Sequence, residues 1–233
     1  MLITTSNAHD ISELQSLVES NRVDGMLLTR ALEDDRALQY LSQANFPTAL
    51  TGTCRYDNII QVDTDNEGAA EKMTTLLIGK GFRRFAFLVK DMSYNVDRKR
   101  HEGFCRALIK NGISEKDQLF YNGSIRMEFL DAIIENIISK KVECIICGDD
   151  EICTMVMSRL QAEGYRIPKD VAIASLYNST NLDCYSPAVT AVSVAASQMG
   201  GTAVRQLIQR LRGENYEKKT MLDYDILFRK STN

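Results

Sequence analysis

Short apolar segments alternate with stretches of helical periodicity from one end of the chain to the other. Ile11, Leu14, Leu17 and Val18 recur at helical spacing, and residues 23–29 (Val-Asp-Gly-Met-Leu-Leu-Thr) then form a run that is typical of a strand. Apolar residues three or four positions apart mark one helix face, whereas short apolar runs between turns indicate buried strands. Strands that alternate with helices in this way predict a parallel sheet with crossover helices.

The same criteria predict the remaining elements of an α/β fold. Further strands are expected at residues 1–6, 46–50, 59–62, 85–89, 119–121, 144–147, 171–176, 189–194 and 220–229. Further helices are expected at residues 34–44, 65–79, 98–110, 127–139, 150–163 and 198–211. No repeat or low-complexity tract interrupts the series.

Composition is that of a soluble globular protein. The 233 residues are 44% hydrophobic and 25% charged, enough for one large domain or two smaller lobes. The net charge is only −3, from 28 basic and 31 acidic residues, so no global field attracts the chain to a polyanion. Any contact with nucleic acid is therefore expected to come from a part outside this chain.

The cysteines and the apolar segments predict a cytoplasmic protein without membrane contact. The six cysteines lack the dense spacing of a disulfide framework, so we interpret them as reduced thiols. No segment reaches the ~20 apolar residues of a membrane span. The first residues, Met-Leu-Ile-Thr-Thr-Ser-Asn, lack the basic lead and long apolar stretch of a secretory signal.

Cys144-Ile-Ile-Cys147 has the spacing of half a metal or redox site. No second such pair exists, and the only histidines, His9 and His101, lie far away in sequence. The run 142–147 is typical of a buried strand, in which an odd separation directs the two sulfurs to opposite faces. We therefore expect these thiols to pack in the core, and we expect no metal.

Sequence signatures of enzymes are missing. The chain has no GxGxxG after a strand, no Walker loop, no GxSxG and no HExxH. Gly79-Lys-Gly81 lies where a helix ends, whereas a phosphate cradle needs it where a helix begins. We expect no catalytic residues and no cofactor, and therefore a protein that is not an enzyme.

Acidic residues follow a buried strand directly. Asp149, Asp150 and Glu151 come after residues 144–147, at the carboxyl edge of the sheet, where open α/β folds bind ligands. One of them is expected to cap the next helix, whose dipole favours negative charge. A ligand role is favoured for Asp149, and a purely helix-terminal role for Asp150.

Two further groups are candidates for ligand contacts. Arg98, Lys99 and Arg100 crowd the expected start of a helix, where cations oppose the helix dipole, and an arginine can hold a diol or carboxylate through two hydrogen bonds. Lys99 is expected to be solvated. Tyr177 and Asn178 end a strand and suit a carbohydrate or a nucleobase, although Asn178 equally suits a simple turn.

Several segments, in this order, resemble the LacI/GalR family of bacterial transcription regulators. They cover essentially the whole chain and are Val23-Asp-Gly-Met-Leu-Leu, Phe46-Pro, Val62-Asp-Thr-Asp-Asn-Glu-Gly-Ala, Gly79-Lys-Gly-Phe-Arg-Arg-Phe-Ala, Arg100-His-Glu-Gly-Phe, Cys147-Gly-Asp-Asp, Gly164-Tyr-Arg-Ile-Pro-Lys-Asp-Val, Pro187-Ala-Val-Thr-Ala-Val and Leu227-Phe-Arg-Lys-Ser-Thr. The resemblance implies a type I periplasmic-binding-protein-like fold, with two Rossmann-like lobes that are joined by three crossings and close on an effector. The lobes implied are residues 1–61 plus 193–217, and residues 62–192 plus 218–233.

The resemblance also implies roles for particular residues. Arg100 resembles an arginine that binds effector hydroxyls or carboxylates, and Asp149 resembles the residue at the Asn-Asp step of the family. Tyr177 and Asn178 stand where the family has an Asp-Asp or Asp-Asn pair.

Other ligand loops are implied at Thr29, Tyr94 and Ile125. Gly52 lies where some sugar-binding members have an aspartate. Gly52 and Tyr177 stand at two positions where the family pattern has acidic residues that contact a sugar. A less hydroxylated or differently charged ligand is therefore expected in place of a common hexose.

Family members begin with a helix-turn-helix headpiece, a hinge, and a first strand and helix of the sensing lobe. This chain opens at what resembles the second strand, so its N-terminal lobe is expected to be truncated. The partners implied are a small-molecule effector, a second copy of the chain in a symmetric dimer, and operator DNA bound only through the headpiece.

Two alternatives stay open at this point. A periplasmic sugar-binding protein of an ABC transporter has the same architecture, but the missing signal peptide and the six cysteines oppose it. A nucleotide-dependent enzyme on a doubly wound sheet lacks a phosphate loop to support it.

Overall fold

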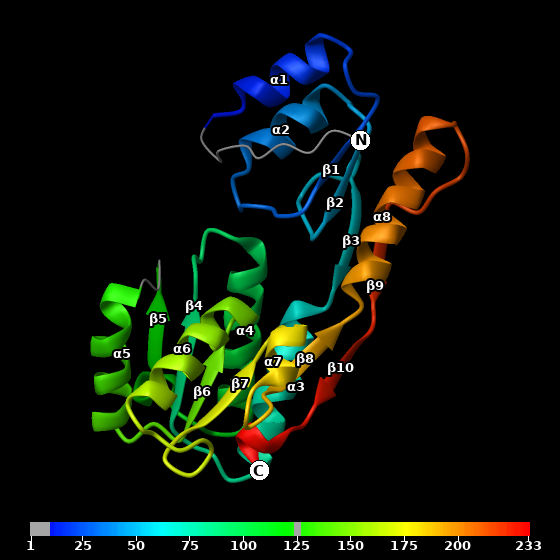
Figure 1. Ribbon diagram of the computed structural model, residues 1–233. Coiled ribbons are helices and arrows are strands. Elements are labelled where there is room, and N and C mark those ends of the chain that lie inside the picture. The colour runs from blue at the N-terminus through cyan, green and yellow to red at the C-terminus, as the bar shows by residue number, and fades with distance from the viewer. Residues whose placement is uncertain (1–9, 124–126) are drawn as a thin grey trace. The chain divides into compact units, whose positions relative to one another are not determined.

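A computed structural model describes residues 10–123 and 127–233, which divide into two compact units (Figure 1). The described residues of the first unit are 10–64, Ser93–Asn95 and Ala195–Leu222. The second unit consists of Asp65–Met92, Val96–Val194 and Asp223–Asn233, apart from residues 124–126. The predicted strand at residues 1–6 lies outside the described residues.

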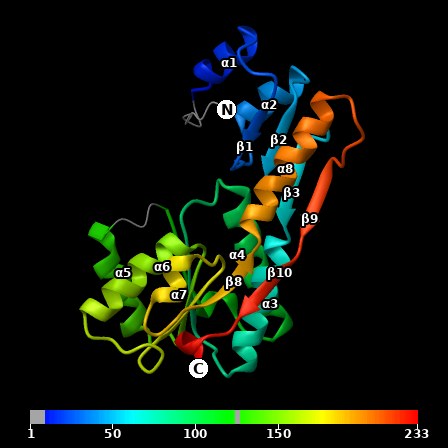
Figure 2. The same cartoon turned by 45° about the vertical axis from the view of Figure 1, so that its right-hand side comes forward.

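The described residues of the first unit form a parallel sheet of four strands. Its strands, in spatial order, are β1 (Met26–Leu28), β2 (Thr48–Thr51), β3 (Ile60–Thr64) and β9 (Lys219–Leu222). Its helices are α1 (Ser12–Glu19), α2 (Arg36–Gln43) and α8 (Ala196–Leu211). Helix α8 packs on β2 and β3, where Ala203 and Leu207 join Ala49, Ile60 and Val62 in one apolar cluster (Figure 2).

In the second unit, the part of the chain that the structure describes forms a sheet of six strands. Its strands, in spatial order, are β10 (Tyr224–Leu227), β8 (Thr190–Val194), β7 (Ala172–Ser175), β6 (Cys144–Cys147), β4 (Phe85–Val89) and β5 (Leu119–Asn122). All neighbours are parallel except β10, which runs antiparallel to β8. Its helices are α3 (Asn66–Gly79), α4 (Asn95–Lys110), α5 (Met127–Ser139), α6 (Asp150–Ala162) and α7 (Thr180–Cys184), with short 3-10 turns η1 (Glu115–Asp117) and η2 (Lys230–Thr232).

Two apolar clusters form the core of the second unit. One combines residues of α5 and α6 with strand residues such as Ile145 and Cys147, and the other combines residues of α3 and α4 with strand residues such as Cys144 and Ile146. Successive residues of β6 therefore alternate between the two clusters, as the pleat of a strand requires. Both thiols of Cys144-Ile-Ile-Cys147 are fully buried, in different clusters, and burial raises the pKa of each.

The predicted α/β class and the parallel sheets are confirmed. The prediction of a single final strand at residues 220–229 is wrong, because this segment forms two strands, β9 and β10, in different sheets. The chain leaves the first sheet after Leu222 and enters the second sheet at Tyr224, with β9 parallel to β3 and β10 antiparallel to β8. The units change at 64/65, 194/195 and 222/223, and Ser93–Asn95 from the intervening stretch also belongs to the first unit. The lobe boundaries that the resemblance implies, at 61/62, 192/193 and 217/218, stay a prediction.

Helices α4 and α7 differ most from the prediction. Helix α4 begins at Asn95, three residues before the expected start. Helix α7 was not predicted, because Asn178-Ser-Thr-Asn was equally compatible with a turn. In the described part of the chain, no helix combines the length and the apolar character needed to cross a bilayer.

Candidate ligand-binding site

The carboxyl ends of β4, β6 and β7 place polar residues along one edge of the second sheet. Because these strands are parallel neighbours, the residues that follow Val89, Cys147 and Ser175 lie at the same edge. Lys90 and Asp149 are among them, and their side chains pair at 2.9 Å. This edge contains four of the predicted ligand residues, namely Arg100, Asp149, Tyr177 and Asn178.

Arg100 is buried at this edge, with 7% of its surface exposed. Its Nη1 donates to the carbonyl oxygen of Gly148 over 2.7 Å, and its Nε donates to Oδ1 of Asn66 over 3.2 Å. A buried guanidinium is tolerated only where such acceptors satisfy it. Arg100 thereby links α3, α4 and the loop after β6, and it lies next to the loop of Asp149.

The reason that the sequence suggested for singling out this basic group is wrong. Since α4 starts at Asn95, Arg100 is its sixth residue and lies in the second turn, not at the N-terminus. The opposition of a cation to the helix dipole is confined to the first turn. Burial and hydrogen bonding, and not the dipole, distinguish Arg100.

The residues after Arg100 let α4 approach the rest of the unit closely. A Cβ on Gly103 would lie 2.1 Å from the backbone oxygen of Glu67, so only glycine allows this contact between α4 and α3. Phe104 is 2% exposed and stacks on Phe87 of β4, with 4.7 Å between ring centroids. The Arg-x-x-Gly-Phe pattern therefore combines a polar contact, a close helix approach and a core anchor.

Asp97 is a member of this cluster that the sequence did not single out. It is 6% exposed, and its Oδ2 accepts a hydrogen bond of 3.1 Å from the backbone N–H of Asp91. Burial raises the pKa of the Asp97 carboxyl, while that hydrogen bond and the charge of Arg100 act in the opposite direction. Its spacing of three from Arg100, which puts both on one face of a helix, was the available signal.

Asp149 is the residue that caps α6. Its Oδ1 accepts from the backbone N–H of Ile152 over 2.9 Å, and its Oδ2 faces Lys90. Lys90 also bonds Glu151. Burial by itself would lower the pKa of Lys90, but the hydrogen bonds to Glu151 and Asp149 outweigh it and raise that pKa. The cap expected within the acidic triplet thus belongs to Asp149 and not to Asp150, and a ligand role for Asp149 stays a prediction.

Tyr177 and Asn178 form the turn between β7 and α7. The Ser175 hydroxyl donates to the backbone oxygen of Tyr177 over 2.6 Å and accepts from its backbone N–H over 3.3 Å. Asn178 Oδ1 accepts from Arg229 Nη1 over 2.9 Å, and Arg229 also pairs with Asp183. The Asn178 side chain is therefore held in place, while the half-buried Tyr177 ring lies beside it in the sequence.

In the first unit, loops after β1 and β2 lie near the segment Ser93–Asn95. Thr29 is exposed directly after β1, and the guanidinium of the next residue, Arg30, lies 5.3 Å from the centroid of the Tyr94 ring. Asn95 Nδ2 donates to the backbone oxygen of Thr53 over 3.0 Å. The structure therefore brings together the three loops that carry the predicted residues Thr29, Gly52 and Tyr94.

Gly52 directly follows β2 and has a backbone conformation that favours glycine. Its φ is +140°, a value that L side chains rarely adopt, and its N–H donates to the Val62 oxygen over 2.9 Å. This conformation gives a local reason for glycine where some family members have an aspartate. Ile125, the remaining predicted site residue, lies outside the described residues.

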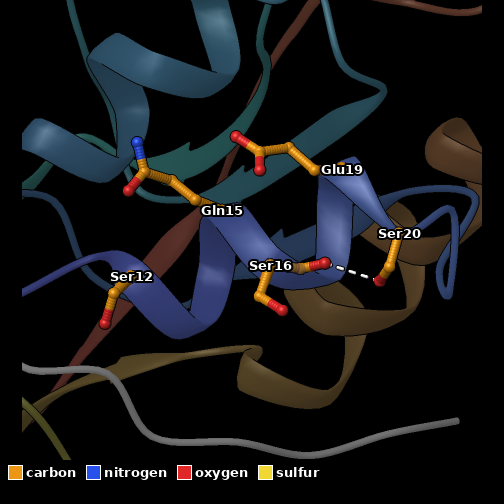
Figure 3. A pocket seen from close by; sticks show the side chains of 5 residues that line it. All are labelled: Ser12, Gln15, Ser16, Glu19 and Ser20. Carbon is orange, nitrogen blue, oxygen red and sulfur yellow. Dashed lines mark hydrogen bonds between the residues drawn. The ribbon is translucent and has the colours of Figure 1, made fainter.

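A shallow depression runs along α1 of the first unit (Figure 3). Its lining consists of Ser12, Gln15, Ser16, Glu19 and Ser20. None of the predicted ligand residues belongs to it, and the hydroxyl of Ser20 is engaged with the backbone oxygen of Ser16. This depression therefore adds nothing to the candidate site.

Comparison with known proteins gives consistent matches. Residues 74–232 match the family described as periplasmic binding protein-like domain. The HTH-type transcriptional regulator CelR of Thermobifida fusca is 26% identical over 237 residues, which cover 99% of this chain and 70% of that protein.

Solved structures agree with the sequence matches. A putative LacI transcriptional regulator from Bacillus cereus subsp. cytotoxis NVH 391-98 superimposes with a TM-score of 0.89 at 28% identity, over 98% of this chain and 83% of that one. A complex of the regulator CelR with cellobiose superimposes with a TM-score of 0.83 at 26% identity, over 94% of this chain and 69% of that one. The family match spans more than half of the chain, which therefore belongs to the periplasmic binding protein-like domain family, in the form found in LacI-type transcription regulators.

Proposed function

We propose that this chain is the effector-sensing part of a LacI/GalR-type transcription regulator. It binds a small molecule, a sugar or sugar derivative, and thereby controls the DNA affinity of a headpiece outside the chain. The coupling between two such sites is typically ~1–3 kcal/mol and is carried by rigid elements with two arrangements. We assign the chain no catalytic role and no cofactor, in line with relatives that are named as regulators.

The observation that carries the proposal is the fixed guanidinium of Arg100 at the carboxyl edge of the second sheet. Its hydrogen bonds to Gly148 and Asn66 hold the planar group in one orientation before any ligand arrives. A preorganised guanidinium can hold a diol or a carboxylate without a large further loss of side-chain entropy. Carboxylates and an amide nearby supply the complementary acceptors that hydroxyl groups require.

The ligand class is supported by chemistry and by one relative. The related CelR structure contains cellobiose, which makes a sugar the first class to test here. Gly52 and Tyr177 replace acidic residues of the family pattern, which favours a sugar derivative with fewer hydroxyls or a different charge. Thr29, Tyr94 and Ile125 stay predicted ligand contacts.

The transporter alternative is less well supported. A periplasmic sugar-binding protein has the same architecture, but the relatives reported above are named as transcription regulators. The same relatives support our proposal that the protein acts in the cytoplasm.

We also infer that the chain acts as a symmetric homodimer, because operator half-sites mirror a two-fold protein. Helix α8 leaves Val204, Ile208 and Leu211 42% exposed, and their spacing of four and three places them on one helix face. An apolar helix face of this kind supports the proposal of an interface between two copies.

The proposed function is tested by thermal-shift and calorimetric titration with neutral sugars, sugar phosphates and purines. We expect one class to raise the melting temperature in proportion to the logarithm of its concentration. Arg100→Lys should lower the affinity for that ligand, since lysine cannot form two parallel hydrogen bonds. Arg106→Ala, which changes an exposed arginine on the same helix, is the matched control and should bind normally. Binding of ATP or NAD, with no response to sugars, would contradict the proposal.

A further inference from the structure

Three side chains with metal-binding atoms gather beside the middle of α4. His101 and Cys105 lie one turn apart on the helix, and Glu115 follows on the short turn η1. One ligand atom from each lies within 4.8 Å of the other two. The cluster includes neither thiol of Cys144-Ile-Ile-Cys147, and both of those thiols are buried in the core.

The separations between these atoms match those around a bound zinc ion. Cys105 Sγ lies 3.5 Å from His101 Nε2 and 3.2 Å from Glu115 Oε1. With tetrahedral angles and metal bonds of 2.0–2.3 Å, neighbouring ligand atoms are separated by about 3.5 Å. The three groups therefore need only small adjustments to receive the ion.

The His101 ring is held in place by aromatic neighbours. Its centroid lies 4.3 Å from that of Phe120 on β5 and 5.8 Å from that of Phe87 on β4. Burial lowers the pKa of His101, and a neutral imidazole offers a nitrogen lone pair to a metal. The imidazole is thus presented in a restricted orientation.

We propose that His101, Cys105 and Glu115 bind a zinc ion, with water as the fourth ligand. Thiolate and imidazole donors select zinc over magnesium or calcium, which prefer oxygen. Glu115 is exposed and the other two are half-buried, so an ion can enter from solvent. The ion joins α4 to the turn that leads into β5. This site is independent of the effector proposed above.

Zinc coordination requires the thiolate form of Cys105. Burial and the hydrogen bond with Glu115 raise the pKa of Cys105 to about 12. A dication reverses this balance, because a coordinating thiol loses its proton to the solvent when the metal bond forms.

The test uses the purified chain, stripped of metal, and Co²⁺ as a spectroscopic probe that Zn²⁺ then displaces. We expect one Co²⁺ per chain, with a near-ultraviolet thiolate-to-cobalt band and the visible bands of tetrahedral coordination. Cys105→Ser should abolish the thiolate band and lower Zn²⁺ affinity at least about 100-fold, more than the 10–100-fold effect typical of outer-shell groups. Cys184→Ser, which changes an exposed thiol on α7, is the matched control and should leave the spectrum unchanged.

Glu115→Gln provides an independent variant with little risk to the fold, because the side chain is exposed. It should lower Zn²⁺ affinity by at least about tenfold while circular dichroism stays unchanged. The proposal is overturned if the wild type shows no thiolate band, if Glu115→Gln binds zinc as the wild type does, or if the band depends on Cys184. If Cys105→Ser fails to fold, loss of affinity in Glu115→Gln together with a normal Cys184→Ser spectrum supports the site.

Discussion

Nη1 of Arg100 donates a 2.7 Å hydrogen bond to the carbonyl oxygen of Gly148, a residue 48 positions away in the sequence. This bond joins α4 to the loop that follows β6, and so holds the arginine beside the loop of Asp149. The two residues that the sequence singled out most strongly for ligand binding therefore share one edge of the second sheet. Several consequences of this arrangement can be measured.

Arg100→Ala should destabilise the chain even without a ligand. The substitution leaves the Gly148 carbonyl and the Asn66 amide oxygen without the guanidinium, and an unsatisfied buried polar group costs about 1–3 kcal/mol. Urea denaturation should show this loss of unfolding free energy. Arg106→Ala serves as control, since exposed ion pairs contribute about 0–1 kcal/mol. Equal stability of the two variants would show that the buried hydrogen bonds of Arg100 contribute nothing.

Gly103→Ala should lower both stability and ligand affinity. The new Cβ would meet the Glu67 backbone oxygen at 2.1 Å, so α4 must move and take Arg100 with it. Overpacking of this kind typically costs 1–3 kcal/mol, roughly the range we expect in urea denaturation. Gly200→Ala on α8 is the matched control, because its Cβ meets nothing within 4 Å and should stabilise that helix by about 0.5–1 kcal/mol. If Gly103→Ala bound the ligand with wild-type affinity, the close approach of α4 to α3 would not be required for ligand binding.

Asp97→Asn should raise stability at neutral pH relative to the wild type, and the gain should shrink in acid. Burial raises the pKa of Asp97 in the folded state above the ordinary value of 3.8, which applies in the unfolded state. Between 3.8 and the raised pKa, the folded state therefore binds more protons than the unfolded state. Wild-type stability from this group therefore falls as pH rises through the raised pKa, and it is restored as pH falls toward 3.8.

The neighbouring charges of Arg100, Lys90 and Asp149 remain in both proteins, so the comparison isolates Asp97. Asparagine keeps an oxygen that can accept from the Asp91 backbone. Urea denaturation of both proteins across this pH range measures the difference. A difference that does not change with pH would indicate that Asp97 does not titrate in the expected window.

Ile208→Glu should convert the proposed dimer to a monomer. The residue is 42% exposed on α8, and a charge there would be buried against the second copy. Sedimentation equilibrium measures the molecular mass, with Ile109→Glu on α4 as control because Ile109 is 69% exposed on a different helix. A wild-type chain that is monomeric at all concentrations would rule out the dimer.

The sequence by itself determined the local elements and many of the residues at strand ends. Apolar periodicity depends on residues only a few positions apart in the sequence. It therefore predicted the bounds of β4, β6 and α5 as the structure has them. The acidic triplet after β6 and the Arg-x-x-Gly-Phe pattern were visible for the same reason. The strand alternation also sufficed for the α/β class.

Only the tertiary structure decided which partners these elements meet. Residues 219–227 have strand character throughout, but pairing with β3 or β8, far away in sequence, assigns them to two different sheets. Likewise, no local pattern indicated that Asp149 would face Lys90 or that Glu115 would meet Cys105. Strand pairing and side-chain contact across a fold depend on non-local packing, whereas helical and strand character depend on the residues nearby.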